Sequence, residues 1–219
     1  MNSNTELLKS QYNVYSQEKY KNFDNGNTRK LNNQTITEAD LKKHTIGKHS
    51  LSYKIDLFSN IFGLDLDVKG QFLSENLRSR ELVALLEIII INLGKEPSIA
   101  FKSRFKGGIH CYYKLEKKYP FNLIGDNLRR IFKDYRAIEI LPTCNKPLRF
   151  PLDHRNGGMI VDRDLNPIKP SQDNYTFLRE KTAEATTYNF NELFGIPSLV
   201  TSFVFDGKTK KKQINNATR

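Results

Sequence analysis

Residues 61–68 decide the fold that this sequence predicts, and they read Ile61-Phe62-Gly63-Leu64-Asp65-Leu66-Asp67-Val68. Apolar and acidic residues alternate at the end of this stretch, as they do in a β-strand with one buried face. Asp65 and Asp67 therefore share one face, and the apolar residues between and beside them share the other. A lone Asp-x-Asp usually marks a solvated strand edge or a turn. Inside an apolar strand, where unpaired carboxylates are costly, the pair indicates function.

Two helices and three further strands are expected after this strand. The bounds are about 74–93 and 120–134 for the helices, and 98–102, 109–114 and 136–141 for the strands. Ser74 suits the N-cap of the first helix, Gly94 suits its C′ position, and Pro120 opens the second helix. The order β-α-β-β-α-β is the split βαβ arrangement of ferredoxin-like and RNA-recognition-like folds. The sequence therefore predicts an α/β (α+β) chain.

The usual strand order of such a sheet is fourth, first, third, second. It places the strand of Asp65 and Asp67 between the strand of Glu139 and the strand of His110. The neighbours of these residues, Ile109, Cys111, Tyr113, Ile138 and Ile140, would face the helices. We therefore expect three acids and a histidine to gather on the sheet face that helices do not cover.

Carboxylates held this close repel one another, and a hard divalent cation offsets that cost. Paired ions can activate a 3′-hydroxyl and stabilise a leaving pyrophosphate. The groups expected to contact a triphosphate are Ser103, Arg104, Lys106, Gly107, Gly108, His110 and Arg149. Structural interpretations remain open for several of them. Glu139 could pair with Arg149 or Arg136, Lys106-Gly107-Gly108 could be an ordinary hairpin turn, and Tyr112 and Tyr113 could pack or, if exposed, stack a base.

Composition narrows the class of protein. The formal net charge of +11 favours a polyanionic partner, although a basic surface without a partner would give the same value. Cys111 and Cys144 lack CxxC spacing, so no zinc site is expected and reduced cytosolic thiols are the default. The longest apolar run, residues 82–93, is too short to span a bilayer, and no secretory signal opens the chain. We expect a cytoplasmic protein that does not bind membranes.

The two ends differ from this regular middle. Residues 1–38 read as an N-terminal extension with one helix over about residues 6–21. Residues 207–219 form a basic tail that is expected to be disordered and that looks like a cut point in a longer protein.

Three short motifs in this order resemble those of the archaeo-eukaryotic primase superfamily. Leu64-Asp65-Leu66-Asp67 is similar to its hDxD strand, Gly108-Ile109-His110 to its small-x-His motif, and Ile138-Glu139 to its third, hydrophobic-acid motif. The flanks at residues 40–55 and 148–162 look like those of primases from TOTE-type conflict systems and mobile elements. The likeness covers roughly residues 40–180. Many members have Ser where this chain has Gly108, and Asp is commoner than Glu at the third acid.

The resemblance implies an N-terminal α/β unit fused to an RNA-recognition-motif-like unit over about residues 60–152, within a catalytic core of residues 39–206. It implies that Asp65, Asp67 and Glu139 hold two Mg²⁺ or Mn²⁺ ions. The residues that it assigns to the incoming nucleotide are His110, Arg149, Ser103, Arg104, Lys106, Gly108 and His154.

The activity implied is that of a DNA primase/polymerase, which makes or extends primers from (d)NTPs on single-stranded DNA during replication of a plasmid, phage or other mobile element. A helicase or a C-terminal domain would lie outside this chain. Two other functions remain open at this point. One is a non-catalytic module that binds single strands through Tyr112 and the basic surplus. The other is different phosphoryl chemistry at the same acids, such as end joining, nucleotide cyclisation or hydrolysis.

Overall fold

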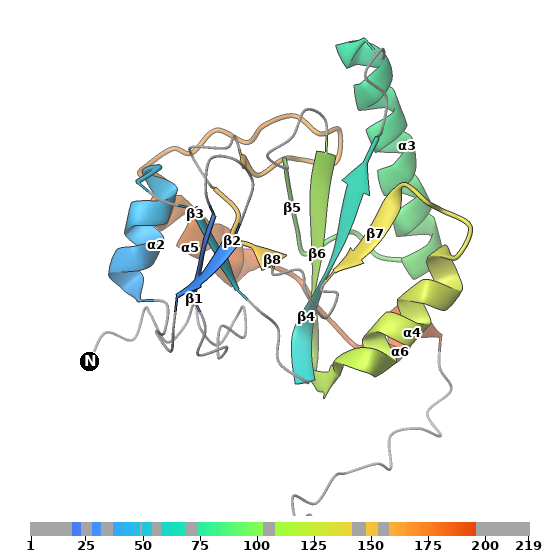
Figure 1. Ribbon diagram of the computed structural model, residues 1–219. Helices are drawn as coiled ribbons and strands as arrows, with labels where there is room; N and C mark the ends of the chain where they lie inside the picture. The colour runs from blue at the N-terminus through green and yellow to red at the C-terminus, as the bar shows by residue number, and fades with distance from the viewer. Residues whose placement is uncertain are drawn as a thin grey trace, which may run out of the picture.

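The computed structural model describes residues 19–22, 28–31, 37–48, 50–53, 58–68, 74–102, 108–141, 148–152 and 158–195. These residues form two mainly antiparallel sheets that are accompanied by helices (Figure 1). The chain is therefore a mixed α and β protein, as its sequence predicts. The tail at residues 207–219 lies outside the described residues.

The central sheet carries the acidic strand. Its members are β4 (Phe58–Asp67), β5 (Ile99–Lys102), β6 (Gly108–Pro120) and β7 (Ile138–Leu141), in the spatial order β5-β6-β4-β7. All three pairs are antiparallel. The expected order of the four strands is confirmed, with β4 between β6 and β7. A short strand, β9 (Thr187–Tyr188), adds a parallel pair to β6.

Two helices connect these strands, and both begin where their capping residues predict. Helix α3 (Glu75–Leu93) starts after Ser74, whose hydroxyl accepts the Leu77 N–H, and it ends at Gly94 in the left-handed conformation with φ 65°. Helix α4 (Phe121–Phe132) follows Pro120. Both pack on one face of the central sheet, where they bury the apolar face of β4. This core includes Phe62, Leu64, Leu66, Leu86, Ile89, Ile109, Cys111, Tyr113, Leu128 and Ile138.

A second unit lies on the other side of the central sheet. Its sheet has the order β2-β1-β3-β8, formed by β2 (Thr28–Leu31), β1 (Lys19–Asn22), β3 (Ser50–Tyr53) and β8 (Leu148–Arg149). Helices α2 (Glu38–Thr45) and α5 (Asn174–Glu184) accompany it, and α6 (Phe190–Phe194) follows near α4 (Figure 1). The sequence predicts an N-terminal helix over about residues 6–21. Residues 6–18 lie outside the described residues, and the prediction is wrong for residues 19–21. Residues 19–22 instead pair with both β2 and β3, so the two sheet ladders satisfy their backbone.

The second core lies between the two units. It includes Leu41, Leu51, Phe150, Tyr175 and Leu178 from the second unit, packed with Ile61, Phe101, Tyr112 and Leu141 from the central sheet. The expectation that no helix covers the acidic face is therefore wrong in part, because α2 and α5 contribute side chains to this core. Within the described ranges, no helix combines the length and the apolar character needed to cross a bilayer.

Candidate active site

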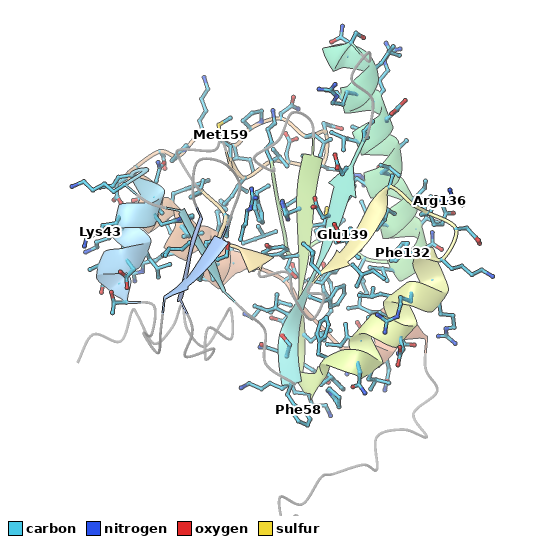
Figure 2. The ribbon with its side chains drawn as sticks, viewed as in Figure 1. Lys43, Phe58, Phe132, Arg136, Glu139 and Met159 are labelled. Carbon is cyan, nitrogen blue, oxygen red and sulfur yellow. The ribbon has the colours of Figure 1, made fainter. Side chains whose placement is uncertain are left out.

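The strand register brings the predicted side chains together in one row across the central sheet. Asp65 is paired with His110 on β6 and with Glu139 on β7. Side chains directly opposite each other on antiparallel strands have Cβ atoms about 4.5–5.5 Å apart and lie on the same face. Glu139 projects from β7 beside β4 (Figure 2). The row is therefore Glu139, Asp65 and His110.

Asp67 extends this row toward solvent. It lies one pleat beyond Asp65 and is paired with Gly108, which has no side chain to crowd the carboxylate. Asp67 is exposed, Glu139 is half-buried, and the Asp65 side chain keeps 24% of its surface accessible. The acids thus lie where the packing of the second core gives way to solvent, so ions and phosphates can reach them.

His110 is held rigidly inside the same face. The residue is 5% exposed, and its ring stacks on Phe101 with a centroid separation of 5.0 Å and an interplanar angle of 7°. Burial, and secondarily the charge of Arg149, lower the pKa of His110 to about 3. Its Nε2 lies 3.8 Å from Asp65 Oδ1, and that carboxylate would favour the charged imidazolium, but burial outweighs it. His110 is therefore neutral near pH 7.

One polar atom of this histidine remains unsatisfied. His110 Nδ1 is buried and has no hydrogen-bond partner among the residues that the structure describes. A buried polar atom without a partner is costly, and such atoms are uncommon in folded proteins.

Arg149 reaches the site from the other unit. Its backbone pairs with Ser52 of β3, and its carbonyl oxygen accepts the Tyr112 hydroxyl at 2.8 Å. The effect of its charge on the pKa of His110 places the guanidinium within electrostatic range of that ring. Tyr112 is only 2% exposed, so it cannot offer its ring to a base without unpacking the second core. This removes Tyr112 as a stacking platform for the binding-module interpretation, which also rested on the basic surplus.

The donor set suits a hard divalent cation only if water and substrate supply ligands as well. No compact group of three His, Cys, Asp or Glu side chains that could hold a metal is found in the described part of the chain. Asp65 and Glu139 are direct neighbours, whereas Asp67 lies farther along β4. Mg²⁺ usually takes one or two carboxylates and completes its shell with waters and phosphate oxygens, which fits this arrangement.

Five of the residues predicted to contact the nucleotide lie outside the described residues, namely Ser103, Arg104, Lys106, Gly107 and His154, as does Cys144. Sequence reasoning missed two residues that shape the site, Phe101 and His44. The pairing of Phe101 with His110 could have been read from the two strands on either side of residues 103–107. His44 carried no signal, because its partners come from distant segments.

Comparison of the sequence with protein-family models and with curated proteins found no match in either set.

Proposed function

We propose that this chain is a metal-dependent nucleotidyltransferase, a DNA primase/polymerase that joins (d)NTPs on a single-stranded DNA template. The observation that carries the proposal is the register of β6, β4 and β7, which aligns His110, Asp65 and Glu139. The resemblance of the three motifs to those of the archaeo-eukaryotic primase superfamily supports it, as does the net charge of +11. We infer that the chain acts in the cytoplasm of a bacterium that carries the replicating element.

In this proposal Asp65, Asp67 and Glu139 hold two Mg²⁺ or Mn²⁺ ions, which would lower the pKa of a 3′-hydroxyl and stabilise the pyrophosphate as it leaves. The protein's own part is positioning and charge. A neutral His110 offers an N–H to a phosphate oxygen without adding a buried charge, and Arg149 provides a fixed cation. Because the acids are arranged on neighbouring strands of one sheet, their geometry is set by the backbone ladder.

The test is incorporation of labelled nucleotides on single-stranded and primed DNA, with Mg²⁺ or Mn²⁺. We expect Asp65→Asn and Glu139→Gln to abolish the product while far-UV circular dichroism stays native. The matched control is Asp126→Asn, which removes an exposed acid of α4 that pairs with Arg129 at 2.6 Å. Full incorporation by Asp65→Asn would refute the metal assignment.

Identification of the product separates polymerisation from the other reactions that two metal ions could support. A ladder of extended strands indicates polymerase activity, and product on unprimed template adds primase activity. A cyclic nucleotide, a ligated end or a free nucleoside diphosphate would replace this proposal with cyclisation, end joining or hydrolysis.

A further inference from the structure

His44 is buried in the second unit, and two backbone groups fix its ring. It lies in the last turn of α2 and has no exposed surface. Its Nδ1 accepts the Leu51 N–H at 3.0 Å, and its Nε2 lies 3.1 Å from the Pro151 carbonyl oxygen. A nitrogen that accepts must be unprotonated, so the proton resides on Nε2, which donates to Pro151. His44 thus bridges β3 and the segment after β8.

This bridge lies where the ladder between β3 and β8 ends. Past Arg149, Phe150 still donates its N–H to Leu51 O at 3.2 Å. Pro151 has no N–H to continue the ladder, and Leu152 adopts a left-handed φ of 59°, which turns the chain away. At this point the His44 ring, in place of a backbone N–H of a neighbouring strand, donates to the Pro151 carbonyl oxygen. Phe150 packs edge-on against that ring, with the ring centroids 6.1 Å apart.

Arg149 is therefore held on both sides. On one side, its carbonyl oxygen accepts the Tyr112 hydroxyl from the central sheet. On the other side, the pairing with Ser52 and the two bonds around Leu51 fix the strand that carries it. A guanidinium on a long side chain contributes to binding only if its backbone is fixed, because ordering it otherwise costs entropy.

We propose that His44 is a positioning residue that fixes Arg149 for its contact with the nucleotide's triphosphate. The inference rests on the proposed function, because the triphosphate contact belongs to it. His44 touches no substrate. It acts by donating to the Pro151 carbonyl, and this contact sets the direction in which the chain leaves Arg149.

Two substitutions separate the positioning role from a merely structural one. His44→Asn keeps an acceptor near the Nδ1 position for Leu51 but cannot reach Pro151, whereas His44→Gln places an amide donor near the Nε2 position and loses the acceptor. Each variant therefore keeps one of the two bonds. We expect His44→Asn to raise KM for the nucleotide about two- to tenfold with kcat unchanged, as the loss of one hydrogen bond implies. His44→Gln should stay near the wild-type KM.

Two further variants each remove another hydrogen bond near His44 or Arg149. Asn174→Ala removes the bond from α5 to the Thr45 carbonyl oxygen, 3.0 Å long, without touching residues 148–152, and should leave KM unchanged. Tyr112→Phe removes the hydroxyl that binds the Arg149 carbonyl oxygen and should raise KM as His44→Asn does. In the Arg149→Ala background, His44→Asn should have no further effect on KM, because the two residues act as a unit.

Equal KM changes in His44→Asn and His44→Gln, or an undiminished effect of His44→Asn in the Arg149→Ala background, would overturn the proposal. If the wild-type chain incorporates no nucleotide, the proposed function fails and the positioning role is judged by amide hydrogen exchange. Faster exchange of the Phe150 N–H in His44→Asn than in His44→Gln supports it. Equal rates in the two variants refute it.

Discussion

Acid should destabilise this protein through His110 specifically. The pKa of His110 is about 3 in the folded chain, because burial disfavours the imidazolium, whereas an unfolded histidine titrates near 6.5. Between these values the unfolded chain binds more protons than the folded chain, so stability falls as the pH falls below 6.5. Well above pH 6.5, His110 is neutral in both the folded and the unfolded chain, so its contribution to the free energy of unfolding no longer changes with pH.

The loss of stability depends on how far the pH lies below 6.5, the pKa of an unfolded histidine. Each pH unit costs about 1.4 kcal/mol, so at pH 5 the folded state loses about 2 kcal/mol relative to pH 7. The comparison is with His110→Gln, which cannot titrate. The other three histidines are present in both proteins, and their contributions cancel in the difference.

The assay is urea unfolding followed by far-UV circular dichroism, since the chain has no tryptophan for fluorescence. Wild type should lose about 2 kcal/mol more of its free energy of unfolding between pH 7 and pH 5 than His110→Gln does. Equal losses would mean that His110 is charged or solvated in the folded chain, and would refute its role as a neutral donor.

Two further outcomes are expected. Gly94→Ala should lower the free energy of unfolding by about 1 kcal/mol, because the added Cβ meets no atom and only the strain of φ 65° remains. Gly125→Ala, inside α4, should instead raise it by about 0.5–1 kcal/mol, since its Cβ meets only the flexible end of Arg129 at 3.3 Å. Both are read by thermal melting, and the same sign for both would contradict the argument.

Local sequence patterns were enough to predict the order of elements in the central sheet, although β6 runs on to Pro120 instead of ending near residue 114, and β4 begins at Phe58. The alternation in β4, the caps of α3 and the proline before α4 each depend on neighbouring residues, and all three are confirmed. The order of strands followed from the number and kind of elements, because a split βαβ arrangement allows few topologies. The face that Asp65, His110 and Glu139 share follows from the alternation along each strand, whereas the register that makes them direct neighbours is known only from the structure.

The second unit could not be predicted in the same way. Arg149 reaches the site only because β8 pairs with β3, and no short-range pattern announces a pairing between segments so far apart. The same holds for His44, whose partner Pro151 is 107 residues away. The sequence predicts helix for residues 19–21 because their polar composition gives only a weak local signal, and tertiary pairing with β2 and β3 overrides it.

The central claim is that the acids on β4 and β7 hold the ions of a nucleotidyl transfer site. Its most direct test is Mn²⁺ binding to the whole chain with a non-hydrolysable nucleoside triphosphate, followed by electron paramagnetic resonance. We predict two bound ions per chain in the wild type and a loss of binding in Asp65→Asn and Glu139→Gln. The same binding in the wild type and in both variants would contradict the account.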